Sequence, residues 1–547
     1  MRVGIISVFT DYHRRGAHHR GVLQPQIGPL IAALLPPDVK IEIVNDTWGD
    51  PDWTRGYDLL FLSCLHSDFD RARQISHYWR KRGAKTVLGG NFASTYTGLC
   101  RPFFDAIAVG DPESTVPRIY HDFCRGELQP LYISSLFSAD RLPTLRLDMA
   151  AGQQVLPLAI EASRGCPFTC EFCALTAVGT RYHTRPVADL VRDIVGGRRM
   201  LEGIASWLQR RIVIFYDNNL GGNLGHLRNL CDAFATLGIR WGACVTFNVV
   251  SNPDIVRRLA AAGCRCVFVG LESFNPSTIC EMGKHQNVIA RTRSVIDSCR
   301  DHGILVMAGL MLSPVSDTLE YISSIPQCLR ECGLHVPTYI SFETPFPGTP
   351  HFKRLVHSDD APFMPNALLR DFNGYTLVTR PQHAGPEEFV SAFKNCYRTV
   401  YSRRARFAKL ADDFPRFARH GNIVPIMFDL YELLSENADV DEHRTYIAGT
   451  EIAPPEAAGV PLTDGDFSGE EERQMIMAPW AVADGSGRAL PHWLDSQQFY
   501  LAKGRTSPRM AAIAATAPSP PGAAGGIMEA DEMALREDGM YQSGMKA

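Results

Sequence analysis

Three cysteines lie within eight positions of one short segment, Cys166-Pro-Phe-Thr-Cys170-Glu-Phe-Cys173, with the spacing C-x3-C-x2-C. A segment this short can direct three thiolates towards one soft metal centre, and thiolates select iron–sulfur clusters, zinc or Cu(I). No fourth cysteine lies nearby, so a four-iron cluster held here would keep one iron open for another ligand. Structural zinc sites favour C-x2-C pairs with a second pair or with histidines, which makes zinc the weaker interpretation.

The residues before the cysteines predict where this loop lies in the fold. Leu158 to Ala162 is an apolar run that follows Pro157, and Arg164-Gly165 separates it from Cys166. This pattern predicts a short buried strand, because proline is tolerated at the start of a strand. The cysteine loop would then follow the carboxyl end of a strand, which is where α/β folds place their chemistry.

The cysteine spacing, with the aromatic Phe172 directly before the last cysteine, resembles the signature of the radical SAM superfamily. The resemblance implies a 4Fe–4S cluster on Cys166, Cys170 and Cys173, whose open iron chelates S-adenosylmethionine (SAM). It also implies a small-molecule substrate and an external electron donor, either a reductase with flavodoxin or a ferredoxin.

The composition is that of a soluble protein with more than one domain. A chain of 547 residues is too long for one hydrophobic core, so two or three domains are expected. The net charge of −4 comes from scattered charges of both signs, which argues against nucleic-acid binding. The sequence contains no apolar run of about 18 residues, so no membrane span is predicted. The N-terminus lacks signal-peptide features, and most of the 15 cysteines lie in apolar surroundings, so we expect a cytoplasmic protein with reduced thiols.

Residues 1–135 alternate strand-like and helix-like runs. Five short apolar strands with helices between them indicate a parallel, doubly wound, Rossmann-like sheet, whose ligands bind beyond the carboxyl ends of the strands. One helix is predicted at Ile27–Leu35. A second helix, with arginines and lysines on its outer face, is predicted at Asp70–Arg82. The predicted strands are Val3–Val8, Lys40–Asn45, Asp58–Ser63, Lys85–Leu88 and Ala106–Val109.

Three of the loops that follow these strands resemble the cobalamin-binding domain of methionine synthase and the mutases. A D-x-H-x-x-G motif with Asp11 and His13 follows the first strand, Ser63 ends the third, and Gly89-Gly90 follows the fourth. In that family the histidine ligates cobalt and the aspartate holds its other ring nitrogen. The serine contacts the displaced base, and the glycines let the chain pass close to the nucleotide tail.

The spacing after this motif departs from that family. About eight residues separate the motif from the next predicted helix, which in the family follows at once. Cobalamin-dependent radical SAM enzymes often lack the histidine motif and leave the lower face of cobalt unligated. Either His13 is the lower cobalt ligand, or cobalamin is held by Ser63, Gly89, Gly90 and backbone groups. A third alternative is a flavodoxin-like domain that binds nothing.

A second series of strands is predicted in residues 156–375, after a linker at residues 136–155. Each strand ends in polar residues, which is typical of a barrel whose rim carries the chemistry. With the strand before the cysteines, six strands are expected, which indicates a partial (β/α)6 barrel. The other five are predicted at Ile212–Tyr216, Trp241–Val245, Cys266–Val269, Val306–Met311 and Thr338–Phe342.

Several strand-end residues match positions at which radical SAM enzymes contact SAM. The resemblance places Asp217 and Asn218 at the methionine amino group, and Glu272 at the ribose or the amino end. It places the Phe172 backbone and the turn around Pro347 beside the adenine. Without the resemblance, helix capping explains such polar residues as well. The candidate SAM contacts are Phe172, Asp217, Asn218, Thr246, Glu272 and Pro347.

The remainder of the chain carries fewer signals. Residues 376–503 are predicted to be a mainly helical C-terminal region, and residues 504–547, rich in Ala, Pro, Gly and Ser, to be disordered. Pro386–Asp412 repeats aromatic residues every four positions, which predicts one amphipathic helix packed on the core. A second helix is predicted at Ile423–Leu434. A small packed patch or a lid is indicated by Trp480, Trp493, Phe499 and Tyr500, with no partner evident from the sequence.

The resemblance to radical SAM enzymes with an N-terminal cobalamin domain implies a methyltransferase. Such an enzyme would use a 4Fe–4S cluster, SAM and cobalamin to methylate an unactivated carbon of a small or lipid-like metabolite. One alternative is a cyclase or rearrangement enzyme with the same cofactors and a tetrapyrrole-type substrate, as in the anaerobic magnesium-protoporphyrin cyclase. The other is a non-catalytic iron–sulfur electron carrier or scaffold, which would hold a cluster without cleaving SAM.

Overall fold

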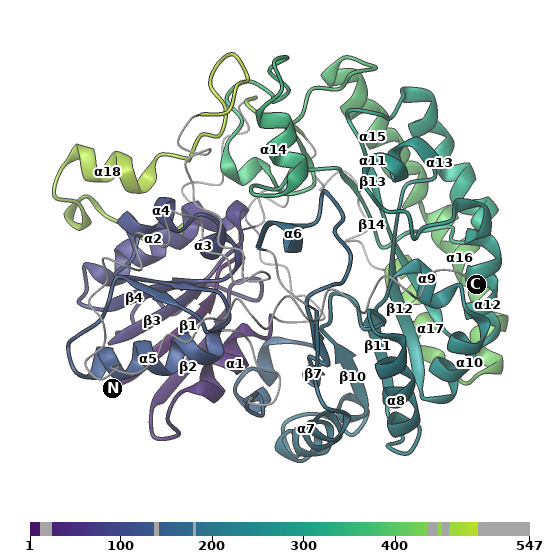
Figure 1. Ribbon diagram of the computed structural model, residues 1–547, viewed down its shortest axis with the longest axis horizontal. Helices are drawn as coiled ribbons and strands as arrows, with labels where there is room; N and C mark the ends of the chain where they lie inside the picture. The colour runs from purple at the N-terminus through teal and green to yellow at the C-terminus, as the bar shows by residue number, and fades with distance from the viewer. Residues whose placement is uncertain (11–24, 136–141, 179–181, 435–445, 451–458, 491–547) are drawn as a thin grey trace, which may run out of the picture. The chain divides into compact units, whose positions relative to one another are not determined.

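A computed structural model describes residues 1–10, 25–135, 142–178, 182–434, 446–450 and 459–490. Two six-stranded parallel sheets carry the chemistry-bearing loops (Figure 1). The predicted cobalt ligand His13, its partner Asp11 and the predicted disordered tail at 504–547 lie outside the described residues. Among the described residues, no helix combines the length and apolarity needed to cross a membrane.

The first sheet has the strand order β2-β1-β3-β4-β5-β6, and all neighbouring strands are parallel. Five strands lie where the apolar runs predicted them. The sixth, β6, was not predicted, because three residues are too few to give a recognisable pattern. The strands are β1 (Arg2–Ser7), β2 (Lys40–Asn45), β3 (Leu59–Ser63), β4 (Lys85–Gly89), β5 (Ala106–Val109) and β6 (Leu131–Ile133).

Helices cover both faces of the first sheet. α1 (Ile27–Leu34) packs against α5 (Pro112–Cys124), and both join one apolar cluster with inward residues of the strands. Figure 1 shows α2 (Phe69–Arg80), α3 (Asn91–Thr95) and α4 (Thr97–Cys100) on the other side. This is the doubly wound arrangement expected when βα units step to both sides of the first strand.

The second sheet has the order β14-β13-β12-β11-β10-β7 and is also parallel throughout. Its six strands lie at the predicted places, and each βα unit adds the next strand on the same side, as right-handed crossovers do. In the described residues β7 and β14 are its two edges, so the sheet is open. The strands are β7 (Ala159–Ile160), β10 (Ile212–Phe215), β11 (Arg240–Cys244), β12 (Cys264–Glu272), β13 (Leu305–Leu312) and β14 (Tyr339–Phe342).

A large apolar core joins this second sheet to its helices. The rings of Phe215 in β10 and Phe234 stack at 5.1 Å, and Trp241 in β11 meets Phe215 edge-on at 5.6 Å. Figure 1 shows the helices along one face of the sheet, which leaves the carboxyl ends of the strands to short loops. The helices are α7 (Val187–Met200), α8 (Leu224–Phe234), α10 (Pro253–Ala261), α12 (Thr292–Asp301) and α13 (Leu319–Cys332).

Shorter helices and strands lie mostly in the segments that connect the strands of the second sheet to its helices. The predicted site residues lie in the same segments or next to them. These elements are β8 (Ser163–Arg164), β9 (His183–Thr184), α6 (Ala174–Val178), α9 (Phe247–Val250), α11 (Pro276–Glu281), α14 (Pro350–Val356), β15 (Thr376–Leu377) and β16 (Tyr446–Ile447).

The prediction of one helix over Pro386–Asp412 was wrong. The chain forms α15 (Pro386–Val400) and α16 (Arg403–Arg419) instead. The hydroxyl of Ser402 accepts a hydrogen bond from the backbone N–H of Ala405 at 3.3 Å and so begins a new helix. The aromatic residues of α15 lie in the core of the second sheet, as predicted, and α17 (Ile423–Leu434) has its predicted bounds.

The last described segment, residues 459–490, packs on α2 of the first sheet. Its helix α18 (Glu470–Met477) lies along α2, and the ring of Phe467 stacks on His77 at 5.1 Å. Trp480 meets the rings of Phe69 at 6.0 Å and Phe103 at 5.9 Å. Trp480 therefore has a partner in the first sheet's helical layer, which no local pattern in the sequence indicates.

The predicted basic outer face of α2 is correct only in part: Arg80, Lys81 and Arg82 are exposed, but two other arginines are buried. Arg71 is 4% and Arg73 is 1% exposed. Arg71 pairs with Asp46 at 2.7 Å, and Arg73 donates to the carbonyl oxygen of Met475 at 2.8 Å. Arg73 also pairs with Asp70 at 2.9 Å, but Asp46 and Met475 lie far away in sequence, so the sequence does not show that these two arginines are buried.

Candidate functional site

The cysteine loop follows β7 and β8 at the carboxyl edge of the second sheet. Cys170 is buried, and Cys166 and Cys173 are partly exposed. The other two thiols act electrostatically on Cys173, so the three lie near one another. Burial raises the pKa of Cys170 and raises that of Cys173 to about 11, a shift that a bound metal cation reverses.

Among the described residues, the three sulfurs do not form a group that could hold one metal ion between them. Within the described ranges, no three His, Cys, Asp or Glu side chains converge on a single metal ion. In a 4Fe–4S cluster each thiolate binds a different iron, so the sulfurs need only surround the cluster. The donor set fits such a cluster in its chemistry, since all three ligands are thiols.

Three polar residues that the sequence did not single out point at these thiols. The side-chain amide of Asn219 donates to the sulfur of Cys166 at 3.8 Å, and that of Gln286 to the sulfur of Cys170 at 3.9 Å. The Lys284 ammonium lies 5.7 Å above the ring of Phe172 and acts electrostatically on Cys170. Donors and positive charge beside the sulfurs favour their thiolate forms.

Asp217 supports the strand that leads into the cysteine loop. Its carboxylate accepts hydrogen bonds from the backbone N–H of Ala162 at 3.0 Å and from the hydroxyl of Ser163. Asp217 is 2% exposed, and burial raises its pKa to about 7. Helix capping does not explain it, because Asn223 caps α8. The next predicted contact, Asn218, is exposed.

Glu272 ends β12 in a conformation that only a few non-glycine residues adopt. Its φ is +65°, and the pairing of β12 with β13 shifts register between Gly270 and Glu272. The side-chain amide of Asn287 donates to the carbonyl oxygens of Gly270 and Leu271 at 3.0 and 2.9 Å and fixes this bulge. The Glu272 carboxylate forms an ion pair with Lys284. Strained backbone of this kind gathers at functional sites.

Among the buried polar atoms at strand ends that lack a hydrogen-bond partner in the described part of the chain, two follow the neighbouring strands β11 and β10. They are the hydroxyl oxygen of Thr246, after β11, and the amide oxygen of Asn219, after β10. Leaving a buried polar atom without a partner costs about 1–3 kcal/mol, so such atoms mark places where a ligand can bind. Both lie at the same edge as the cysteines. The site residues therefore fit a polar ligand beside the cluster loop.

The turn before α14 bounds this side of the site. Pro347 is buried in it, and Thr349 caps α14 by accepting from the backbone N–H of Phe352 at 3.1 Å. The backbone N–H of His351 donates to the carbonyl oxygen of Glu171 in the cysteine loop at 3.2 Å. The predicted adenine-flanking residues, the Pro347 turn and Phe172, are thus tied to one another through their neighbours.

A cavity of about 230 Å³ lies beside this turn. A carboxylate oxygen of Glu343, which follows β14, is 3.3 Å from Nδ1 of His351, and both side chains are buried. Burial raises the pKa of Glu343 to about 7 and lowers that of His351 to about 4. Near neutral pH the cavity therefore holds a neutral imidazole beside a carboxyl that exchanges its proton readily. No pattern in the sequence indicates this pair, because neither Glu343 nor His351 belongs to a recognisable motif.

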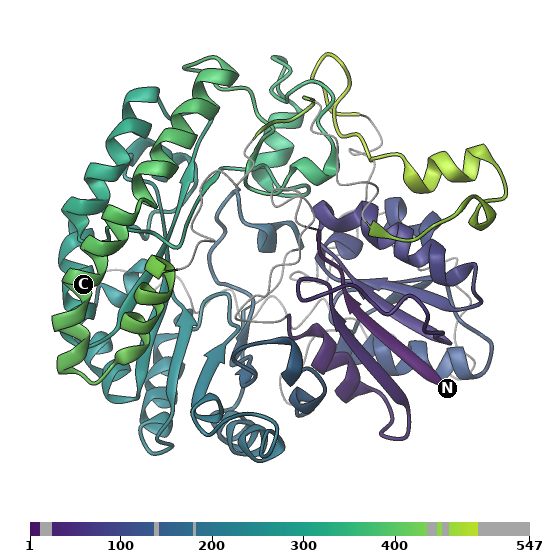
Figure 2. The same ribbon diagram turned by 180° about the vertical axis from the view of Figure 1, so that it is seen from behind.

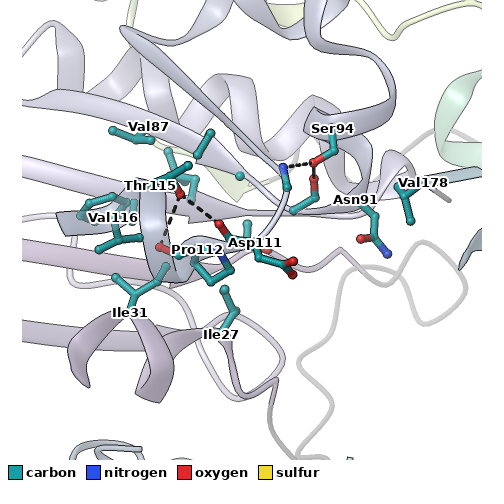
Figure 3. A pocket seen from close by; sticks show the side chains of 17 residues that line it. Ile27, Ile31, Val87, Asn91, Ser94, Asp111, Pro112, Thr115, Val116 and Val178 are labelled. Carbon is teal, nitrogen blue, oxygen red and sulfur yellow. Dashed lines mark hydrogen bonds between the residues drawn. The ribbon is translucent and has the colours of Figure 1, made fainter. Parts of the chain in front are cut away.

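A second cavity, of about 180 Å³, lies at the carboxyl edge of the first sheet (Figure 3). Ser63, Gly89 and Gly90, the predicted cobalamin contacts, all line it. Gly90 has φ +101°, and a Cβ there would lie 3.1 Å from the Ser63 hydroxyl, so a side chain would crowd the opening. The walls are mostly apolar, and the Ser94 hydroxyl accepts from the Gly110 backbone N–H at 2.9 Å.

Arg164 links this cavity to the cysteine loop. It stands two residues before Cys166 and donates to Asp111, which lines the cavity, at 2.8 Å. It also pairs with Glu113 at the start of α5 at 2.9 Å and with Glu161 at 2.7 Å. Burial lowers the pKa of Arg164. The carboxylates of Glu161 and Glu113 raise this pKa by more than burial lowers it, so the guanidinium stays charged.

Comparison with known proteins agrees with this geometry. Residues 160–321 match the Radical SAM superfamily. The chain is 26% identical over 386 residues to the bacteriochlorophyllide d C-8(2)-methyltransferase of Chlorobaculum tepidum, covering 68% of this chain and 84% of the relative. It is 26% identical over 411 residues to the hopanoid C-2 methylase of Rhodopseudomonas palustris, covering 70% and 72%. Similarity to the anaerobic magnesium-protoporphyrin IX monomethyl ester cyclase of Cereibacter sphaeroides is weaker, 21% over 45% of this chain and 39% of the cyclase.

The fold is also found in a solved structure. The radical S-adenosylmethionine methyltransferase TsrM from Kitasatospora setae, solved with cobalamin and a [4Fe-4S] cluster bound, superposes with a TM-score of 0.52. The superposition covers 82% of this chain and 93% of TsrM at 16% identity. The family match at residues 160–321 contains all three cysteines and the carboxyl ends of five strands of the second sheet, those of β7, β10, β11, β12 and β13. The chain therefore carries a radical SAM domain at residues 160–321 and is an enzyme.

Proposed function

We propose that this enzyme is a cobalamin-dependent methyltransferase that acts on an unactivated carbon of a small or lipid-like metabolite. The observation that carries the proposal is the first-sheet cavity, where Ser63, Gly89 and Gly90 come together, joined through Asp111 and Arg164 to the cysteine loop. The names of two relatives that match over most of their length, a methyltransferase and a methylase, support it. These names specify a bacteriochlorophyllide and a hopanoid, which supports a small or lipid-like metabolite as the substrate.

Each group of residues has a distinct part in this proposal. Residues 1–135 would hold cobalamin, with Ser63, Gly89 and Gly90 around its base, and Asp11 and His13 as further candidates. Residues 156–375 would hold the cluster on Cys166, Cys170 and Cys173 and bind SAM. When bound, these cofactors supply a radical that removes hydrogen from carbon, and a methyl group to replace it.

The chain's own residues position and polarise these groups. Asp217 holds the backbone that leads into the cluster loop, and Lys284 with Glu272 places an ion pair against Phe172. The buried oxygens of Thr246 and Asn219 offer acceptors for the polar end of SAM. An electron donor such as flavodoxin or a ferredoxin would reduce the cluster. Cyclisation of a tetrapyrrole-type substrate stays the second candidate.

Anaerobic reconstitution and reduction with dithionite test the proposal. Wild-type protein should hold about four irons and release 5′-deoxyadenosine from SAM. A C166A/C170A/C173A variant should lose both. Gly89→Val should retain iron and SAM cleavage but lose bound cobalamin, because its side chain fills the cavity; a Cβ there meets Ala108 at an ordinary 3.7 Å.

Gly98→Val is the matched control, since nothing lies within 4 Å of a Cβ at Gly98. It should keep cobalamin. Unchanged cobalamin content in Gly89→Val would place the cofactor elsewhere, and a full cluster in the triple cysteine variant would refute the cluster assignment. With substrate present, one S-adenosylhomocysteine for each product indicates methyl transfer, whereas cyclisation yields none.

A further inference from the structure

Helices α16 and α17 bury several charged side chains and expose several large apolar ones, which departs from the usual arrangement. Lys409 and Asp413 of α16 and Asp429 of α17 are at most 9% exposed. Lys409 pairs with Asp413 at 3.1 Å and with Asp429, and Arg300 pairs with Asp413 at 2.8 Å. The charges that anchor this helical pair are thus neutralised internally.

Five large apolar side chains lie on the outer side of the same two helices. On α16, Phe407 is 62% and Phe414 is 56% exposed, and on α17, Ile423 is 57%, Met427 is 62% and Leu430 is 45% exposed. Their spacings of seven, four and three residues place them on one face of each helix. We call these five residues the apolar face.

The two stripes adjoin each other. α16 and α17 are joined by residues 420–422 and pack against one another, running side by side in Figure 2 (light green). Two helices joined by so short a turn run antiparallel, so Phe414 and Met427 lie at similar distances from the turn. Ala411, Pro415 and Ala418 of α16 are exposed too and extend the apolar surface. Contiguous exposed apolar surface marks an interaction site.

Arginines stand at both ends of the apolar face. Arg403 and Arg404 begin α16, Arg419 ends it, and all three are exposed. No side-chain hydrogen bond or ion pair of these three is seen within the described residues. An apolar helical face flanked by exposed arginines is the pattern of helices that lie in a membrane interface, where apolar side chains enter the acyl boundary and cations meet headgroups.

We propose that the apolar face docks this enzyme on a lipid bilayer surface that carries anionic headgroups. Charge favours this occupant over a second copy of the chain, because a symmetric dimer through this face would bring the arginines of both copies together. The proposal does not rest on the proposed function, since the apolar face lies on helices that contribute none of the cofactor-binding residues named above. Surface docking would give the enzyme access to substrates dissolved in the bilayer.

Co-sedimentation with sucrose-loaded vesicles tests this proposal on the full chain. Wild-type protein should bind vesicles of phosphatidylcholine with phosphatidylglycerol about tenfold more tightly than vesicles of phosphatidylcholine alone. F407S/F414S/M427S should lower binding at least about tenfold, since it removes most of the buried apolar area. R403Q/R404Q should remove the preference for the anionic vesicles. The variant should still bind vesicles of phosphatidylcholine alone as tightly as wild type does.

I204S/W207S/L208S is the matched control, because these side chains are 54%, 63% and 55% exposed in a different loop. It should bind vesicles like wild type. All variants change exposed residues, and equal iron content confirms that they fold. No binding of wild-type protein to either vesicle overturns the proposal. Equal vesicle binding by wild type and F407S/F414S/M427S also overturns the proposal. A wild-type dimer in light scattering that F407S/F414S/M427S abolishes overturns it too, because the face would then bind a second copy of the chain.

Discussion

Single buried side chains decide the chemistry of the second-sheet site. The cysteines were predictable because three thiols in eight positions have few other uses. Asn219, Gln286 and Lys284 were not predictable, since each acts on a thiol or ring far away in sequence. Asp217 was found, but its carboxylate is engaged with Ala162 and Ser163, which a strand-end position alone does not reveal.

Glu343 should lower the stability of the enzyme as pH rises. Its pKa is about 7 in the folded chain against an ordinary 4.5, so the folded state holds the proton more tightly than the unfolded state. Below pH 4.5 Glu343 is protonated in both the folded and the unfolded state, so its ionisation does not change the unfolding free energy. Between pH 4.5 and 7 ionisation increasingly favours unfolding, by up to about 3 kcal/mol.

Glu343→Gln removes this ionisation. In anaerobic denaturant titrations the variant should exceed wild type in unfolding free energy by about 2–3 kcal/mol at pH 8. The difference should shrink by at least half at pH 5. Glu320→Gln, at an exposed position, should show no such change of difference with pH. Parallel wild-type and Glu343→Gln curves across this range would show that Glu343 ionises normally.

Secondary-structure elements were predictable where their pattern was long enough. Buried parallel strands give apolar runs, so five strands of the first sheet and six of the second were found. The three-residue β6 gives no run, and the break at Ser402 was missed because the aromatic repeat continues to Tyr401, one residue before the new helix cap. Pairings between elements, such as that of β8 and α5 through Arg164, have no periodic signal at all.

The Arg164–Glu113 pair should stabilise the contact between α5 and the strand before the cysteine loop. Both side chains are 15% exposed, so water screens the pair only partly. A double-mutant cycle with Arg164→Ala and Glu113→Gln should give a coupling free energy of about 1–2 kcal/mol. The exposed pair Arg257–Asp254, with side chains 67% and 77% exposed, should give less than about 0.5 kcal/mol. Equal coupling in the two cycles would mean that Arg164 makes only a surface ion pair.

At the scale of the whole molecule, contacts between distant parts of the chain escaped sequence reasoning. Residues 459–490 return to α2, and their anchor is Arg73, whose guanidinium lies 5.9 Å from the Trp480 ring. Neither partner carries a local signal of the other: Arg73 reads as a solvent-facing helix residue, and Trp480 lies in a segment with little periodicity. The cavity at the carboxyl edge of the first sheet was predictable in part, because parallel strands bring their carboxyl ends to one edge.

The return of this segment to α2 should contribute to the stability of the first sheet. Trp480→Ala removes a partly buried ring that contacts Phe69 and Phe103, so we expect a loss of about 2 kcal/mol in unfolding free energy. Trypsin should then cleave faster within 459–490, at Arg473, because α18 loses its attachment. Trp207→Ala is the control, because this ring is 63% exposed. It should change the unfolding free energy and the rate of trypsin cleavage much less than Trp480→Ala does. Cluster iron should stay constant in both variants, since neither ring contacts the cysteine loop. If Trp480→Ala keeps wild-type stability and cleavage rate, the segment is held by its ion pairs, of which Arg82–Asp466 at 2.8 Å is the next to remove.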